Sequence, residues 1–347
     1  MAARAKPAHP PRETTPVPDP VVAIFSLGGT IAMTTDPATG GVVPALSAQE
    51  LLDAVPALQG LPLDLRVHDF RRLPGASLTF DDITALSSAI TTALQTGCVG
   101  AVVTQGTDTI EETAYLLDLL HCGDAPIVVT GAMRNPTQPG ADGPANLHAA
   151  VIAAGSPQLR GAGVVVVLND EIHASRTVRK SHSTSPAAFT SPATGPLGRL
   201  YEGRVHLHSP LAQRTVTPSE LTNPAPRVGL YTATLGDDGT LLAAMADACD
   251  GLVIAAFGVG HVPQDFVAVL ERTAARIPVV LASRIGNGPV LQATYSFPGS
   301  EKDLLQRGLI RAGHLDPYKA RLLIHVLLAQ GRTSTEIADA FHTTAAH

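Results

Sequence analysis

The chain is predicted to be an α/β protein of two domains, a larger N-terminal doubly wound sheet and a smaller C-terminal α/β domain. Three observations carry this prediction: a length of 347 residues, short apolar runs that alternate with helix-like stretches, and a lapse of that alternation at 209–227. A chain of this length can bury two separate cores. Apolar, β-branched runs that alternate with amphipathic segments are typical of parallel strands whose connecting helices cover both faces of a sheet.

The N-terminal domain is expected at 21–208, after a tail. The tail, 1–20, contains six prolines and no apolar run, which predicts disorder and argues against a signal peptide or a membrane-spanning helix. The strands expected in the domain are Val21–Leu27, Gly100–Thr104, Pro126–Gly131 and Gly163–Leu168. The helices expected there are Asp81–Leu94, Ile110–Leu120 and Ala145–Ala154.

A proline- and threonine-rich stretch, 209–227, is predicted to be the linker to the C-terminal domain at 228–347. The strands expected in that domain are Val228–Thr232, Gly251–Phe257 and Ile277–Ala282, and a helix at Asp316–Gln330 is expected to close it.

Composition excludes several classes of partner. The net charge of -6, without a long basic run, is unsuited to nucleic acid. Only 16% of residues are charged, below the roughly 25% usual in soluble domains, which indicates extensive burial or a subunit interface. The three scattered cysteines fit buried reduced thiols better than a disulfide framework or a zinc site, and no metal is expected.

The first motif with chemical potential is Ser26-Leu27-Gly28-Gly29-Thr30-Ile31-Ala32, which follows the first expected strand. Ligands of open α/β sheets bind beyond the carboxyl ends of the strands, so polar residues there carry functional weight. Two glycines allow a tight turn that presents Thr30, a candidate nucleophile. A plain tight turn is the alternative, and the Gly-x-Gly-x-x-Gly and Gly-Lys-Ser/Thr phosphate loops are absent.

The second motif is Gln105-Gly106-Thr107-Asp108-Thr109-Ile110-Glu111-Glu112, between an expected strand and an expected helix. Capping of the helix by Asp108 or Thr109, with the two glutamates complementing the helix dipole, explains much of this run. That account leaves Gly106-Thr107 without a role.

Together the two motifs, about 75 residues apart, resemble the paired signatures of bacterial-type L-asparaginases. The resemblance covers most of 21–200 and is looser beyond it. It continues through Gly131-Ala132-Met133-Arg134, Ala141-Asp142-Gly143-Pro144, Asn169-Asp170, Arg176, Lys180 and Gly195-Pro196-Leu197-Gly198.

This resemblance implies a set of site residues. Thr30 takes the place of the attacking threonine and Thr107 that of the second threonine. Asp108 takes the place of the aspartate that clamps the substrate ammonium, and Lys180 that of the catalytic lysine. The substrate-binding residues implied are Asp108, Ser77, Gly29, Ala76 and Gly106.

The chemistry requires residues of these types. A threonine hydroxyl is a poor nucleophile at neutral pH and needs a base or a proton relay. Lys180 is expected to be the base for Thr107, which requires desolvation or a nearby positive charge to lower its pKa. Backbone N–H groups of the glycine turns are expected to stabilise the oxyanion.

Two departures from the family pattern are visible. Met33–Pro44 occupies the place of a mobile lid, and its glycines and small polar residues suit a closing loop. Many relatives carry a tyrosine in the lid and this stretch has none, which leaves open the residue that replaces it. The family completes its pocket from a neighbouring subunit; there His261 replaces an expected asparagine, and Tyr295 or Glu301 lies near the expected acidic position.

The expected function is hydrolysis of L-asparagine to L-aspartate and ammonia through a threonine ester, without a cofactor, in the cytoplasm. One alternative is a glutaminase-asparaginase that prefers L-glutamine, because one methylene changes binding by only about 1–3 kcal/mol. Others are a non-catalytic amino-acid-binding relative and an ammonia-supplying amidotransferase subunit, which should carry an extra N-terminal domain. The expected partners are the small-molecule substrate and further copies of the chain, in a homodimer or homotetramer, with neither nucleic acid nor membrane.

Overall fold

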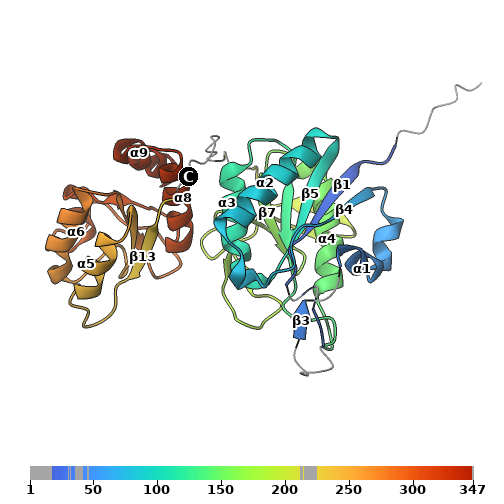
Figure 1. Cartoon of the computed structure of the whole chain (residues 1–347), viewed down its shortest axis with the longest axis horizontal. Coiled ribbons are helices and arrows are strands. Elements are labelled where there is room, and N and C mark those ends of the chain that lie inside the picture. Colours follow the sequence, from blue (N-terminus) through green and yellow to red (C-terminus); the bar gives the residue numbers. More distant parts are fainter. Residues whose placement is uncertain are drawn as a thin grey trace, which may run out of the picture.

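The computed structural model describes residues 18–29, 31, 33–35, 42–44, 47–211, 214 and 225–345. The described residues form two α/β domains that lie side by side, and the larger one comes first in the chain (Figure 1). The predicted fold class is therefore confirmed. Most of the predicted tail and much of the predicted linker lie outside the described residues, so the domain limits stay a prediction.

The larger sheet has eight strands among the described residues, in the order β12-β11-β8-β7-β6-β5-β1-β4. These strands are β1 (Val21–Ser26), β4 (Asp64–Asp69), β5 (Cys98–Thr104), β6 (Ile127–Thr130), β7 (Val164–Leu168), β8 (Glu171–Ala174), β11 (Gly198–Tyr201) and β12 (Arg204–Leu207). The run from β4 to β7 is parallel, as expected, whereas β8, β11 and β12 add antiparallel pairs. The sheet is thus mixed.

A tight hairpin is the physical reason for the antiparallel part. Asn169 and Asp170 join β7 to β8 and have φ of 53° and 59°. Asparagine and aspartate adopt this left-handed conformation more readily than other residues with side chains, and two such residues in succession suit a two-residue hairpin turn. The chain therefore reverses directly after β7 and does not cross over through a helix.

Helices cover both faces of this sheet. They are α1 (Ala48–Asp53), α2 (Phe80–Gln95), α3 (Ile110–Leu120) and α4 (Gly143–Gly155). In β1, Ala23 and Phe25 pack into the core on the α2 and α3 side, while Val22 and Ile24 pack into the core on the α1 and α4 side. Successive side chains of a strand point to opposite faces, so a strand buried on both sides reads as a continuous apolar run.

Short elements complete this domain. They are β2 (Met33–Thr35), β3 (Val42–Pro44), β9 (Arg179–Lys180), β10 (Phe189–Thr190), η2 (Pro56–Gly60), η3 (Gly75–Ser77), η4 (Thr107–Thr109) and η5 (Pro157–Leu159). β2 and β3 form an antiparallel pair inside the expected lid, and β9 pairs with β10.

The C-terminal domain has a parallel sheet in the order β13-β14-β15-β16. Its elements are β13 (Val228–Thr232), α5 (Thr240–Asp247), β14 (Gly251–Ala256), η6 (Gln264–Phe266), α6 (Val267–Ala274), β15 (Val279–Ser283), α7 (Glu301–Gln306), β16 (Ile310–Arg311), α8 (Pro317–Ala329) and α9 (Ser334–Ala345). Helix α8 packs against α3 of the larger domain (Figure 1). One apolar core runs through this contact, since Leu117 and Leu323 belong to the same buried cluster.

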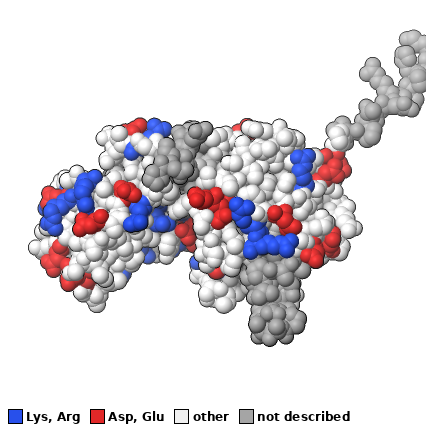
Figure 2. All heavy atoms as spheres, viewed as in Figure 1, with Lys and Arg blue, Asp and Glu red and all other residues white. Residues whose placement is uncertain are grey.

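The surface and the cysteines bear on the composition argument. On the face shown in Figure 2, charged side chains of both signs are interspersed and separated by wide uncharged areas. Cys98 is buried as expected, but Cys122 is exposed, which corrects the expectation of three buried thiols; all three are unpaired. Within the described ranges, no helix is long and apolar enough to cross a membrane, and no cluster of three potential metal-binding side chains occurs.

Candidate active site

Three glycine-containing loops meet at the carboxyl edge of the larger sheet. Gly29 follows β1, Gly106 follows β5, and Gly75 begins η3. A Cβ added to Gly29, whose φ is +89°, would lie 2.0 Å from the backbone nitrogen of Gly106, and one added to Gly106 would lie 3.0 Å from that of Gly75. Backbone approaches backbone here so closely that a side chain at Gly29 has no room. Two of the predicted substrate-binding residues, Gly29 and Gly106, are thereby brought together.

Lys180 joins two of the predicted catalytic residues. Its Nζ donates a hydrogen bond of 3.0 Å to Thr107 Oγ1 and one of 2.7 Å to Asp108 Oδ1. The partners are more than 70 positions apart in the chain. The lysine side chain is only 15% exposed, whereas that of Asp108 is 67% exposed. Three of the four predicted catalytic residues are therefore in contact, and the fourth, Thr30, lies outside the described residues.

Hydrogen bonds from the Gln105 side chain stabilise the turn that contains Thr107. This fully buried side chain donates to Thr109 Oγ1 at 3.2 Å and to the Gly106 carbonyl at 3.3 Å. The Thr109 hydroxyl in turn donates to the Gly75 carbonyl at 3.0 Å. Neither Thr109 nor Asp108 forms a side-chain cap on α3, so the capping account of this motif is wrong. Gln105 was missed because a glutamine after a strand carries no signal of its own.

The Gly75-Ala76-Ser77 turn, which contains two of the predicted substrate-binding residues, lies beside this site. Its 3-10 turn η3 packs against η4, which contains Thr107. Ala76 and Ser77 are exposed, while Gly75 is buried. The Ser77 hydroxyl has no hydrogen-bond partner among the described residues.

Comparisons with known proteins give the family. The model of the N-terminal asparaginase domain matches residues 21–213, and that of the glutaminase/asparaginase C-terminal domain matches residues 227–341. The chain belongs to the asparaginase family. The resemblance predicted from the motifs is thus confirmed.

Individual relatives span nearly the whole of this asparaginase-family chain. An L-asparaginase of Bacillus licheniformis is 35% identical over 311 residues, which cover 89% of this chain and 95% of the relative. A glutaminase-asparaginase of Pseudomonas fluorescens is 31% identical over 330 residues, which cover 92% and 89%. The crystal structure of a probable cytoplasmic L-asparaginase from Campylobacter jejuni superposes with a TM-score of 0.82 at 30% identity, covering 93% of this chain and 99% of that one.

In this member of the asparaginase family, the C-terminal residues His261 and Glu301 form a cluster of their own. His261 Nε2 lies 3.2 Å from Glu301 Oε2, and Glu301 Oε1 accepts from the backbone amides of Thr294 and Tyr295 at 3.0 and 2.8 Å. Burial alone would raise the pKa of Glu301, but the backbone amides and His261 together bring it below the ordinary value. The His261 ring also meets the edges of Tyr295 and Phe297, with centroids 4.9 and 5.0 Å away.

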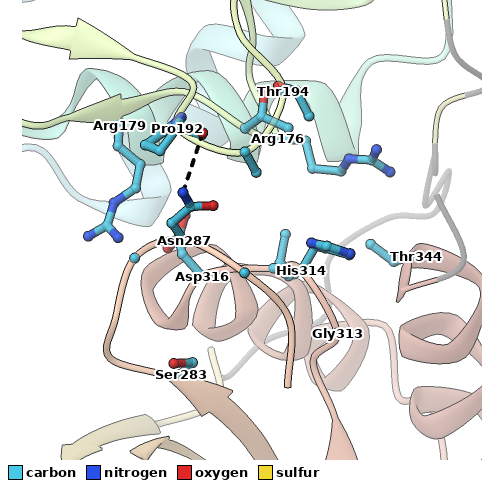
Figure 3. A pocket seen from close by; sticks show the side chains of 15 residues that line it. Arg176, Arg179, Pro192, Thr194, Ser283, Asn287, Gly313, His314, Asp316 and Thr344 are labelled. Carbon is cyan, nitrogen blue, oxygen red and sulfur yellow. Dashed lines mark hydrogen bonds between the residues drawn. The ribbon is translucent and has the colours of Figure 1, made fainter. Parts of the chain in front are cut away.

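A cavity of about 220 Å³ lies between the two domains and is lined by residues of both. Arg176, Arg179, Asn287, His314 and Asp316 are among its lining residues, and Figure 3 shows Asn287 reaching across the gap to Pro192. None of the predicted catalytic or substrate-binding residues that the structure describes lines it. This hollow therefore lies at the domain boundary, and its lining includes Arg179, the neighbour of Lys180 in β9.

Proposed function

We propose that this protein hydrolyses the side-chain amide of L-asparagine, releasing L-aspartate and ammonia through a threonine acyl-enzyme. The observation that carries the proposal is the contact of Lys180 with both Thr107 and Asp108 at the sheet edge. A hydroxyl, an amine and a carboxylate in mutual contact can relay a proton and hold a charged substrate. Membership of the asparaginase family, with relatives named L-asparaginase, supports the choice of substrate.

The proposed reaction has two halves. The Thr30 oxygen attacks the amide carbon, its proton passes through the relay of Thr107 and Lys180 to the amide nitrogen, and ammonia leaves. Water then attacks the resulting ester, gives a proton back to the Thr30 oxygen, and L-aspartate is released. The assignment of Thr30 rests on its place in the family motif and on the tight turn made by Gly28 and Gly29, whose φ values are 97° and 89°. No cofactor takes part in either half.

Binding of the amino-acid backbone is proposed to use the rim of the site. The exposed carboxylate of Asp108 is suited to the substrate ammonium, because it is 67% exposed and only one side of it is taken by Lys180. Ser77 and Ala76 are exposed beside it and are suited to the substrate carboxylate. Gly29 and Gly106 leave backbone close to the reacting amide.

We also propose that the chain is a homodimer or homotetramer whose sites are shared between subunits. The low charge fraction and the 43% exposure of the Tyr295 side chain support an interface. Of the two residues expected near the acidic position, Tyr295 is the better candidate, since Glu301 is fully buried and both its oxygens have partners within its own domain. Light scattering should report at least twice the 35.9 kDa chain mass. A monomer with full activity would contradict shared sites.

The expected lid and compartment stay proposals. Limited proteolysis between Met33 and Pro44 should slow when L-aspartate is added, and equal cleavage with and without it would contradict a closing lid. A cytoplasmic location is supported by the likeness to the Campylobacter jejuni protein, which is described as a probable cytoplasmic L-asparaginase.

The decisive experiment is ammonia release from L-asparagine and L-glutamine by the purified protein. Faster release from L-asparagine is expected. Faster release from L-glutamine would favour the glutaminase-asparaginase alternative. The relative from Pseudomonas fluorescens, which is named a glutaminase-asparaginase, supports keeping that alternative. Release from neither would favour a non-catalytic amino-acid-binding protein.

A second experiment assigns the attacking threonine. An amide analogue with a better leaving group should leave an acyl adduct that peptide mass spectrometry finds on Thr30, and Thr107→Val should still accumulate it. An adduct found only on Thr107, and still formed by Thr30→Ala, would reverse the two roles.

A further inference from the structure

A fully buried lysine of the C-terminal domain reaches the segment that carries Lys180. Lys319, on α8, is 0% exposed. Its Nζ donates to the carbonyl of Val178, just before β9, and, at 2.8 Å, to Asp316 Oδ2, and it lies 3.8 Å from Glu111 Oε2. Lysine is almost never buried completely unless it is paired. Two of these three partners, Val178 and Glu111, belong to the larger domain, so the charge joins the two domains.

The contacts of Lys319 fall on the unpaired edge of strand β9. On the other edge β9 pairs with β10: Lys180 lies opposite Phe189, and the amide of Ser181 donates to the Ala188 carbonyl at 2.7 Å. In an antiparallel pair, alternate residues direct their N–H and C=O groups toward the partner strand. The carbonyl of Val178 and the amide of Lys180 therefore point to the free edge. Val178 is buried, and buried backbone groups at an edge of this kind would be unsatisfied without another partner.

The ion pair of Lys319 and Glu111 provides the polar contacts that a third strand would otherwise make at this edge. Lys319 supplies the donor for the Val178 carbonyl. The Glu111 carboxylate faces the backbone amide of Lys180, and this amide is one of the groups that lower the pKa of Glu111. Burial has the larger effect and leaves the pKa of Glu111 raised, with the charge of Lys319 as the strongest opposing influence. The charge of Lys319 thus favours the ionised form of Glu111.

Glu111 also belongs to the segment that carries the other catalytic residues. It lies in the first turn of α3, which follows directly on the η4 turn of Thr107 and Asp108. The pair of Lys319 and Glu111 therefore ties the backbone under Lys180 to the backbone under Thr107. The side-chain contact of 3.0 Å between Lys180 and Thr107 spans the same two segments.

We propose that Lys319 is a positioning residue, which fixes strand β9 so that the amine of Lys180 stays on Thr107 and Asp108. The inference rests on the proposed function, because it gives those three residues their role. Lys319 itself does not touch the substrate. Its loss lets the strand shift, and a displacement of about 1 Å in a catalytic group can lower a rate by about a hundredfold.

The first test is Lys319→Met, which keeps most of the length of the unbranched side chain and removes its charge. Asn287→Ala is the matched control, because it also removes a hydrogen bond between the domains, of 3.4 Å, whose acceptor, the Pro192 carbonyl, lies outside β9. For Lys319→Met, kcat on L-asparagine should fall about a hundredfold with KM within about threefold, while Asn287→Ala keeps both. A purely structural role predicts instead equal kcat per folded molecule, and this result would overturn the proposal.

Hydrogen exchange gives a readout that does not depend on turnover. In Lys319→Met, amides in the peptide that contains Val178 and Lys180 should exchange faster, while those of the α2 peptide keep their wild-type rates. Unchanged exchange in the β9 peptide would overturn the proposal. A wild-type protein that releases ammonia from neither amide would instead contradict the proposed function, and the exchange result would still decide whether the tether exists.

Glu111→Gln tests the same contact from the other side, and it can be used if the Lys319 variant does not fold. It should lower kcat in the same direction, because the neutral amide no longer pairs with the lysine. In the double variant the loss should not exceed the larger single loss, since both residues act through one contact. Losses that multiply would mean independent effects and would contradict the single tether.

Discussion

The polar groups that follow the parallel strands of the two sheets differ in what they contact. In the N-terminal domain, β5 is followed by Gly106-Thr107-Asp108, in which Thr107 and Asp108 contact a distant lysine and the Asp108 side chain stays exposed. In the C-terminal domain, β14 is followed by a turn that ends at His261, where Gly258 and Gly260 have φ of 47° and 119°. His261 pairs with a glutamate whose oxygens all have partners within the domain.

The difference shows that position at a strand end does not by itself make a residue reactive. Asp108 follows β5, whereas Glu301 is the first residue of α7 and pairs with His261, which follows β14. Asp108 keeps most of its surface for a ligand, whereas the oxygens of Glu301 are taken by backbone amides and by His261. We therefore expect changes at the first edge to act on turnover and changes at the second to act on stability.

Removal of the Thr107 hydroxyl should have the largest effect. Thr107→Val should lower kcat on L-asparagine by about a thousandfold, or ~4 kcal/mol of transition-state stabilisation, because the relay to Lys180 is broken. Stopped assays of ammonia release measure it, with thermal unfolding as the control for folding. A loss below tenfold would mean that the Thr107 hydroxyl does not take part in the reaction.

Acid should act on the C-terminal domain through His325 of α8. This buried ring stacks on Phe80 of the other domain, with centroids 3.7 Å apart. Burial, and then the nearby charge of Arg321, lower its pKa from 6.5 to about 4. A lowered pKa contributes stability that is present above pH 6.5 and is lost as the pH falls toward 4.

Relative to His325→Phe, which keeps the stack and cannot titrate, the wild type should therefore lose about 3 kcal/mol of unfolding free energy over this interval, at ~1.4 kcal/mol per pKa unit. Denaturant unfolding at a series of pH values gives the difference. Parallel pH curves for the two proteins would contradict a buried neutral histidine.

Removal of the charge of Glu301 should affect stability, with little effect on rate. Glu301→Gln sets an amide NH₂ near backbone donors and should cost about 2 kcal/mol of unfolding free energy, with kcat within about threefold. Because the pKa of Glu301 is lowered in the fold, this advantage of the wild type is present above its ordinary pKa of 4.5 and disappears as the pH falls below it. A large loss of kcat in a stable variant would place Glu301 in the chemistry after all.

The matching change at the first edge, Asp108→Asn, should leave stability almost unchanged and weaken kcat/KM for L-asparagine by about tenfold or more. An analogue without the α-amino group should lose much less, since it lacks the ammonium that Asp108 is proposed to bind. Steady-state kinetics with both substrates test this. Equal losses would mean that the carboxylate only holds Lys180.

Most strands and helices could be predicted from local pattern, because their periodicity reflects burial. The stretch Ile110–Leu120 was predicted from its apolar spacing and is α3 within the same limits. The antiparallel half of the large sheet was missed, since only the left-handed turn at Asn169-Asp170 distinguishes a hairpin from a crossover. The roles of Glu111 and Gln105 were missed for a similar reason. Distant segments of the chain bury these two side chains, and the residues next to them in the sequence do not indicate that burial.

The sequence by itself determined the fold class, the family and the types of residue in the candidate site, because short-range spacing and composition encode them. Only the tertiary structure decided which charges meet. Lys180 reaches Thr107 across 73 positions, and Lys319 reaches Val178 across 141. Such contacts depend on the packing of α3 against α8 and on the free edge of β9. Their energies come from burial and geometry, which no local run of residues records.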